Sequence, residues 1–325
     1  MPERAYSPSP ASLTSVEVDA IVIGGGPAGL SAALNLGYSR ASVVVLDSGR
    51  PRNAATVRSH GFLTRDGMPS QELRRLGRAE LAAYPGVKLF DRTTVSALLA
   101  SDSASGMRFI AALQGRGAGA PAVAARSVVI ATGLRETLPA IANLRAFYGL
   151  SVFSCASCDP WELQDRPLGL IGETADLAAR ARLIARWTDR LTVFTNGASV
   201  VEADEEAELA ASGIGVERRG IAELAGQGGA VSAVRLTDGT SVPIEGGFIR
   251  PTWQPSLGFL APLEVERDAS GSLVVDAAGR TSLPGLYAAG DAVAAGPQQL
   301  IVSAGQAARA AASLAHDLVG VRTAF

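Results

Sequence analysis

The stretch DAIVIGGGPAGLSAALNL, residues 19–36, decides the fold class of this chain. The run DAIVI predicts a buried strand, the glycines that follow predict a tight turn, and the Ala- and Leu-rich residues after them predict a helix. A second apolar run, 42–46, ends at Asp47, which lies 21 residues after Gly26. In dinucleotide-binding proteins such glycines let the backbone approach a pyrophosphate at the helix N-terminus, and such an acid binds the ribose hydroxyls. The stretch therefore predicts a dinucleotide-binding βαβ unit.

Three further segments extend this pattern along the chain. The apolar run 127–130 leads into Ala131-Thr132-Gly133, and GLYAAGDA at 285–292 has the same form, followed by a helix over about 304–319. Between them, 168–171, 175–187 and 191–194 read as strand, helix and strand, a second copy of the unit. We therefore expect an α/β protein of two Rossmann-like domains, the second inserted into the first.

The expected domain boundaries follow from these segments. Residues 18–134 and 251–325 form the first domain and 135–250 the inserted one, while the Ser- and Pro-rich residues 1–17 are expected to be a flexible arm.

Composition excludes several functional classes. The chain has 325 residues, 47% hydrophobic and 18% charged, which suits a globular protein of two domains. Its net charge of −2 gives no cation excess for nucleic acid. No run of 18 apolar residues and no secretory leader is present, so we expect a cytoplasmic protein that does not bind a membrane.

The cysteines point to redox chemistry. Both cysteines of the chain, Cys155 and Cys158, fall in one C-x-x-C, a spacing that lets two sulfurs cycle between dithiol and disulfide. The only histidines, His60 and His316, are distant in sequence, so we expect no metal site.

These motifs together resemble the low-molecular-weight thioredoxin reductase family of flavoprotein disulfide oxidoreductases, from about residue 18 to 318. The resemblance is carried by GGGPAG (24–29), ATG (131–133), SCASCD (154–159), GLYAAGDA and QQLIVSAGQAA (298–308). In that family the first domain binds FAD, the inserted domain binds NADPH, and the C-x-x-C lies on the inserted domain.

The resemblance implies a role for each matching residue. Cys158 would be the flavin-proximal sulfur and Cys155 the one that exchanges with substrate, with Asp159 moving the proton. Asp159 could instead be only a charge at a helix N-terminus. A homodimer is also implied by the resemblance alone. The implied FAD-binding residues are Gly24, Gly26, Pro27, Ala28, Gly29, Asp47, Ala131, Thr132, Gly133, Gly290, Asp291, Gln298, Gln299 and Leu300.

The second glycine turn departs from the family pattern. Thr174 stands where a glycine should admit the pyrophosphate, Leu177 replaces a small residue, and Glu173 and Asp176 add negative charge. The family's His-Arg-Arg, which holds the 2′-phosphate of NADPH, is replaced by 195–197 (TNG). We therefore expect NADPH to bind poorly, although a divergent site for NADPH or NADH remains an alternative.

Loss of the nicotinamide site with retention of FAD and C-x-x-C resembles the dithiol oxidases of gliotoxin, holomycin and romidepsin biosynthesis. The segment 50–67 looks like the corresponding stretch of that branch, whereas Asp159 stands where some members are expected to have histidine. The predicted function is oxidation of a small-molecule dithiol, with electrons passing to FAD and then to O₂ to give H₂O₂. The alternatives are a thioredoxin-disulfide reductase that uses NADPH or ferredoxin, and a flavin-binding redox sensor.

Four side chains outside these motifs have simpler expected roles. His60 is expected in a surface loop and His316 at a solvated helix position. Trp161 and Trp253 are expected to be buried packing residues, with the lining of a substrate cleft as the alternative.

Overall fold

The computed structural model describes residues 14–102, 106–114, 122–293 and 296–322, and residues 1–13 of the expected arm lie outside this part. The chain divides into two compact units. Unit 1 consists of the chain up to Ala54, Gly61–Arg135, and Gln254 onwards; unit 2 consists of Ala55–His60 and Glu136–Trp253. The units are described separately, and their mixed α/β architecture is that expected from the two βαβ patterns.

Unit 1 begins with the predicted strand, turn and helix. Its elements are β1 (Thr14–Ile23), α1 (Pro27–Tyr38), β2 (Val43–Asp47), η2 (Arg52–Ala55), α2 (Ser70–Glu80), η3 (Leu81–Ala83), β3 (Val87–Asp91), β4 (Val95–Ala100), β5 (Phe109–Leu113), β6 (Ala122–Ile130), η5 (Gly258–Leu260), β17 (Leu286–Ala288), η6 (Gly290–Ala292) and α6 (Leu300–Leu318). In the described residues the sheet has seven strands in the order β3-β2-β1-β6-β5-β4, and β17 also pairs with β6. β1 pairs in parallel with β2 and β6, whereas β5 is antiparallel to β6 and β4.

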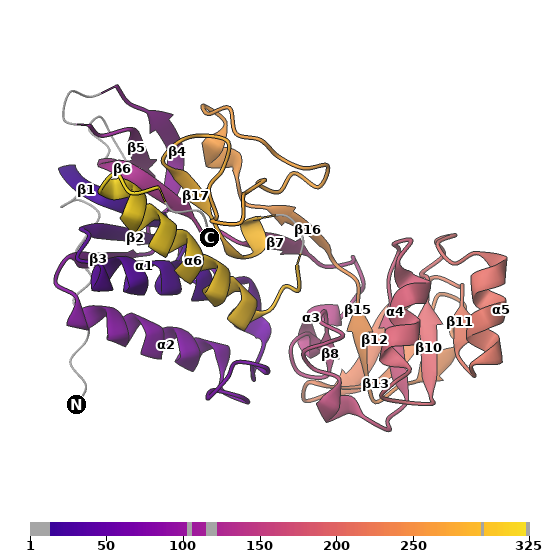
Figure 1. Cartoon of the computed structure of the whole chain (residues 1–325). Helices are drawn as coiled ribbons and strands as arrows, with labels where there is room; N and C mark the ends of the chain where they lie inside the picture. Colours follow the sequence, from indigo (N-terminus) through magenta and orange to yellow (C-terminus); the bar gives the residue numbers. More distant parts are fainter. Residues whose placement is uncertain (1–13, 103–105, 115–121, 294–295, 323–325) are drawn as a thin grey trace. The chain divides into compact units, whose positions relative to one another are not determined.

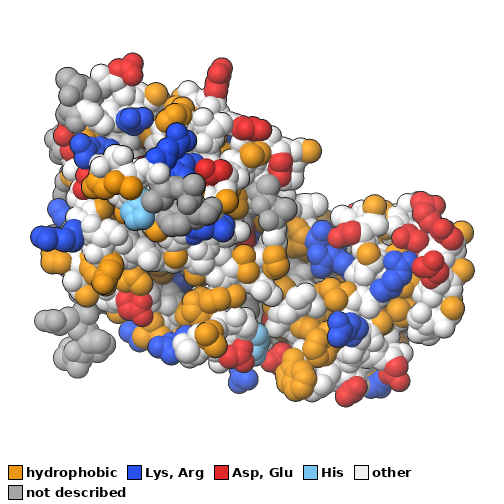
Figure 2. Space-filling model, viewed as in Figure 1, with side chains coloured by type: hydrophobic (Ala, Val, Ile, Leu, Met, Phe, Trp, Pro, Cys, Tyr) orange, Lys and Arg blue, Asp and Glu red, His pale blue; other side chains and the backbone are white. Residues whose placement is uncertain are grey.

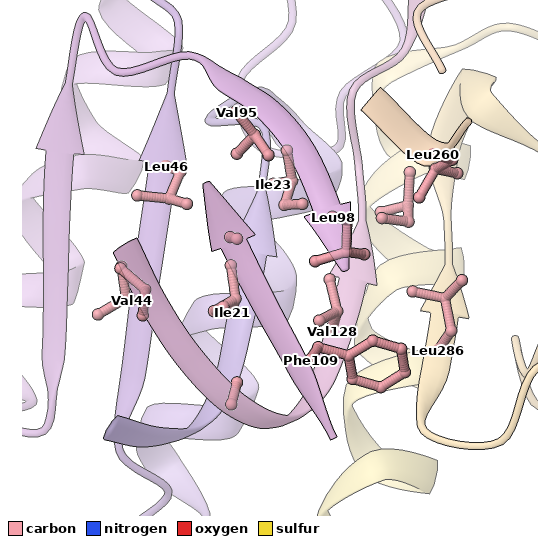
Figure 3. Close-up of a cluster of buried hydrophobic side chains, with 14 of the residues drawn as sticks. Ile21, Ile23, Val44, Leu46, Val95, Leu98, Phe109, Val128, Leu260 and Leu286 are labelled. Atoms are coloured by element: carbon pink, nitrogen blue, oxygen red, sulfur yellow. The ribbon is translucent and has the colours of Figure 1, made fainter. Parts of the chain in front are cut away.

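The two faces of this sheet carry separate hydrophobic cores. Because successive side chains of a strand point to opposite faces, Ile21 and Ile23 of β1 join one core, with Phe109, Leu98 and η5 (Figure 3). The alternate residues of β1 join the other core, under α1 and α6. Figure 1 shows α6, in yellow, running along α1, with which it packs. This packing fixes the start of α1, where the glycine turn lies.

Unit 2 repeats the pattern on a smaller scale. Its elements are α3 (Leu144–Phe147), β8 (Val152–Phe153), η4 (Trp161–Leu163), β9 (Leu168–Ile171), α4 (Leu177–Ile184), β10 (Leu191–Phe194), α5 (Ala203–Ala211), β11 (Gly215–Glu217), β12 (Ile221–Gln227), β13 (Ala230–Leu236), β14 (Ser241–Pro243) and β15 (Gly246–Ile249). A parallel sheet with order β11-β10-β9-β15-β8 holds the second glycine turn, after β9. An antiparallel sheet, β12-β13-β14, completes the unit. The chain passes between the units through β7 (Leu134–Thr137) and β16 (Thr252–Pro255), which pair with each other.

The mixture of charges on the surface is consistent with the net charge of −2. Figure 2 shows cations and anions interspersed on this face, with acidic side chains gathered over α5, where the sequence reads ADEEAELAA. In the described part of the chain, no helix is both long enough and apolar enough to cross a bilayer.

Candidate functional site

The first glycine turn of unit 1 borders a cavity. Gly24 has φ +116°, and a Cβ added there would lie 2.2 Å from the carbonyl oxygen of Ala131. Gly26 is the N-cap of α1 and Pro27 begins the helix, so the helix N-terminus faces open space, with nothing within 4 Å of a Cβ placed on Gly26. The cavity beside the turn has a volume of about 410 Å³.

Most of the predicted cofactor-binding residues meet at this cavity. Gln298, Gln299 and Gly29 are not in its wall. Gly29 instead allows close packing, because a Cβ there would lie 1.8 Å from the Gly24 carbonyl oxygen. Gln299 is the N-cap of α6, and Gln298 is exposed. The predicted residues in the cavity wall are Gly24, Gly26, Pro27, Ala28, Asp47, Ala131, Thr132, Gly133, Gly290, Asp291 and Leu300.

Arginines that sequence reasoning missed pair with the acids of this cavity. The buried Asp47 accepts hydrogen bonds from the Gly49 amide at 2.9 Å, from Arg74 at 3.3 Å and from Arg78. Arg52 donates to Asp291 at 2.6 Å. The arginines come from α2 and η2, where no motif marks them. Arg52 and Arg74 line the cavity, while Arg78 lies behind Asp47, where it also binds Asp91.

Buried polar atoms without partners also mark this region. Within the described residues, Thr132 Oγ1 and the Nε atoms of Arg74 and Arg78 are buried and make no hydrogen bond. Thr132 and Arg74 both line the cavity. Because an unpaired buried polar group costs about 1–3 kcal/mol, such groups are expected where a ligand supplies the missing partner.

The cysteines form a disulfide in unit 2. Cys155 and Cys158 lie between β8 and η4, with Cα atoms 5.3 Å apart, and the Cys158 amide donates to the Cys155 carbonyl at 3.3 Å. Both residues are partly exposed, so a substrate sulfur can reach the bond. The two sulfurs and a carboxylate oxygen of Asp159 all lie within 4.8 Å of one another.

Asp159 is placed to exchange a proton with these sulfurs. It is only 8% exposed. Burial, and after it the negative charge of Glu162, raise the pKa of Asp159 to about 7, while the charge of His60 acts in the opposite direction. Near neutral pH the carboxyl group can therefore either give or take a proton, which suits a general acid for a leaving thiolate.

At the second glycine turn the chain's own side chains bind one another. Asp176, at the N-terminus of α4, accepts hydrogen bonds from Thr174 at 2.6 Å, from Arg180 at 3.2 Å and from Arg250 at 3.1 Å. Arg250 Nη2 also lies 2.7 Å from the second oxygen of Asp176, and its guanidinium stacks 4.3 Å from the ring centroid of Trp253. Burial alone would raise the pKa of Asp176, but the hydrogen bonds from Arg250 and Thr174 lower it to about 2. An ionised carboxylate thus occupies the helix N-terminus, where a pyrophosphate would bind.

The segment that replaces the His-Arg-Arg motif is also fixed in place. Asn196 donates to Glu173 at 2.6 Å and accepts from the Ile221 amide at 2.7 Å. Arginines are thus present near the turn, on α4 and after β15, and both bind Asp176, although Arg250 Nη1 and Thr195 Oγ1 are buried without a hydrogen-bond partner in the described residues.

Three of the simpler side-chain expectations need comment. The prediction that Trp161 is buried is wrong, because it is 64% exposed and touches Trp187 edge-on, with ring centroids 6.2 Å apart. Trp253 is half-buried and donates to Glu136 at 3.1 Å. His60 is partly exposed and lies outside the regular elements, as expected of a surface loop, and its Nε2 lies 3.0 Å from Glu162 Oε1.

Comparisons with known proteins agree with this arrangement. The family model described as "Pyridine nucleotide-disulphide oxidoreductase" matches residues 18–309. The chain is 32% identical over 179 residues to the "Probable thioredoxin reductase" of Arthroderma benhamiae, covering 55% of this chain and 44% of that protein. It is 28% identical over 290 residues to thioredoxin reductase tcpT of Claviceps purpurea, covering 86% of this chain and 87% of the relative.

A solved structure shows the same architecture. The crystal structure of HlmI is 34% identical, with a TM-score of 0.87, over 94% of this chain and 95% of HlmI. The residues matched by the family model, 18–309, include both glycine turns and the C-x-x-C.

Proposed function

Because the chain belongs to the pyridine nucleotide-disulphide oxidoreductase family, we propose that it is an FAD-dependent dithiol oxidase. The family consists of oxidoreductases that use FAD, and the chain is thioredoxin reductase-like. The finer activity rests on the disulfide and on the contrast between the two glycine turns.

The cavity of unit 1 fits FAD. Its glycine turn leaves room at the N-terminus of α1, and buried donors without partners, Thr132 Oγ1 and Arg74 Nε, are there for a ligand to satisfy. Gly26 and the first turn of α1 would receive the pyrophosphate, while Asp47 would bind ribose hydroxyls and Asp291 a polar group nearer the flavin. When bound, FAD supplies a two-electron acceptor that can pass electrons on to O₂.

The disulfide of unit 2 would oxidise the substrate. One thiolate of a dithiol forms a bond to Cys155 and breaks the Cys155–Cys158 bond, and the released sulfur of Cys158 takes a proton from Asp159. The second substrate thiolate then attacks the mixed disulfide and releases Cys155. The substrate loses two electrons and two protons and becomes a disulfide, while the enzyme becomes a dithiol. Reduction of one O₂ to H₂O₂ balances each turnover.

The observation that carries the proposal is the Asp176 carboxylate in the second turn. Arg250 and Arg180 are cations at the start of α4, and both bind Asp176. A dinucleotide would have to displace an ionised internal carboxylate. We therefore propose that NADPH is a poor reductant and that electrons enter through the substrate dithiol.

Oxygen uptake tests this proposal directly. FAD-loaded protein should consume O₂ and form H₂O₂ with dithiothreitol, and should do so far more slowly with NADPH. The protein carrying both Cys155→Ser and Cys158→Ser keeps the flavin and serves as the control for direct reaction of dithiothreitol with FAD. Rapid anaerobic flavin reduction by micromolar NADPH would refute the oxidase assignment.

Two alternatives give different outcomes. A thioredoxin-disulfide reductase would turn over when NADPH or reduced ferredoxin is supplied with a disulfide substrate. A flavin-binding redox sensor would become reduced once and would show no steady turnover in air.

A further inference from the structure

A short segment, residues 55–60, belongs to unit 2, although the chain before and after it belongs to unit 1. We call it the strap. In sequence it lies between β2 and α2, both in unit 1, yet its residues cluster with unit 2. Its first residue is packed against Gly149, which has φ +82°, and a Cβ added to Gly149 would lie 2.1 Å from the Ala55 carbonyl oxygen. Only glycine permits this approach, so Ala55 packs closely against Gly149 within unit 2.

The strap ends at a contact with η4, the short helix that follows the redox disulfide in the chain. His60 Nε2 lies 3.0 Å from Glu162 Oε1, and Glu162 belongs to η4, three residues after Asp159. The side chains of His60 and Glu162 are 24% and 38% exposed, so they reach solvent, whereas Asp159 is buried. A cation-forming and an anionic side chain thus lie together next to the buried carboxyl group.

We propose that His60 is a positioning residue for the redox disulfide and that, with Glu162, it determines whether Asp159 holds the proton required by the leaving sulfur. This inference rests on the proposed thiol–disulfide chemistry. The chemical step is the opening of the Cys155–Cys158 bond by a substrate thiolate: one S–S bond forms, one breaks, and the released thiolate takes its proton from Asp159. If Asp159 is ionised, the released sulfur stays unprotonated and the step is slower.

The charges around Asp159 act in opposite directions. The charged groups that influence it are Glu162 on η4 and His60 on the strap: the first raises the pKa of Asp159 and the second lowers it. Removing the charge of Glu162 should therefore lower the pKa of Asp159, and removing the charge of His60 should raise it. A purely structural role would not produce opposite shifts.

The test measures the rate of disulfide opening against pH. Anaerobic protein is mixed with dithiothreitol, and newly formed protein thiols are trapped by alkylation and counted by mass spectrometry. For the wild-type chain and for each variant, the rate is divided by the rate of the same protein that also carries Asp159→Asn. This ratio cancels the pH dependence that comes from the ionisation of dithiothreitol. For the wild-type chain this ratio should fall as pH rises, with a midpoint near 7, because Asp159 loses its proton there.

The two variants are expected to move that midpoint apart. Glu162→Gln should lower it and His60→Gln should raise it, each by about half a pH unit or more, as expected for charges near a buried group. His316→Gln, on α6 in unit 1, is the matched control and should leave the midpoint unchanged. Glu162→Asp should restore most of the wild-type midpoint.

Three results would overturn the inference. They are a ratio that does not depend on pH, shifts of the same sign in both variants, and an unchanged midpoint in His60→Gln. None of them depends on oxygen uptake, so failure of the oxidase assignment and failure of this inference are separable. Flavin content and the unfolding temperature of each variant show whether it has folded.

Discussion

The two glycine turns follow the same backbone plan but offer a dinucleotide different surroundings. Each follows a buried parallel strand, β1 or β9, and leads into a helix, α1 or α4. After β1 the turn opens onto a cavity, whereas after β9 Asp176 accepts hydrogen bonds from two arginines at the helix start. The comparison teaches that the βαβ backbone alone does not make a nucleotide site, because the residues of the turn decide whether the helix N-terminus is free for a ligand.

The largest difference should appear when a methyl group is added to each turn. Gly29→Ala would place Cβ 1.8 Å from a backbone oxygen, so we expect a loss of roughly 3 kcal/mol or more in unfolding free energy, together with loss of FAD. Gly172→Ala would meet side-chain carbons of Arg250 and Leu177 at 2.8 Å, which can shift, so the cost should be about 1 kcal/mol. Denaturant unfolding and flavin content measure both. Equal losses in the two variants would show that the turns are equally tight.

A second prediction concerns the internal carboxylate. Asp176→Ala should destabilise the protein by roughly 1–3 kcal/mol, because it leaves the guanidinium groups of Arg250 and Arg180 without their anion. Its pKa is lowered to about 2, so this stability is fully present above about pH 4 and should be lost as pH falls towards 2. Asp189→Ala, at a side chain that is 94% exposed, is the control and should change stability by about 0.5 kcal/mol or less.

Combining Asp176→Ala with Arg250→Ala tests whether Asp176 and Arg250 stabilise the protein as a pair. In the double variant Asp176→Ala with Arg250→Ala, the loss should be smaller than the sum of the single losses, since no unpaired Arg250 remains. Additive losses would mean that Asp176 is not bound to Arg250 in solution, and the second turn would then be open like the first.

The sequence predicts the first turn better than its surroundings. The glycines and Asp47 can be recognised because their spacing follows from the geometry of one βαβ unit. The pairing of Arg52, Arg74 and Arg78 with Asp291 and Asp47 could not be recognised from the sequence. These arginines lie on η2 and α2, which only the tertiary fold brings close to the two acids.

In the second turn, the sequence indicated excess negative charge but not what it binds. Arg250 follows β15, 74 residues after Asp176, so the pair is visible only once the parallel sheet has formed. The proximity of His60 to Glu162 could not be predicted for the same reason, because a dinucleotide-fold pattern gives no sign that residues 55–60 belong to unit 2.

The smallest predicted effect is the most specific for FAD. Gly26 has φ −83°, which alanine adopts without strain, and nothing lies within 4 Å of an added Cβ. Gly26→Ala should therefore change the unfolding free energy of the FAD-free protein by about 1 kcal/mol or less, because the lower entropy of the unfolded chain is opposed by the weaker N-cap preference of alanine. The added methyl group should nevertheless weaken FAD about tenfold, equivalent to about 1.4 kcal/mol, because it lies where the pyrophosphate approaches the backbone. Gly215→Ala is the matched control in unit 2, since its Cβ would also meet nothing, and it should bind FAD as the wild-type chain does. Fluorescence titration of FAD-free protein measures both affinities, and wild-type affinity in Gly26→Ala would mean that the phosphates do not bind at this turn.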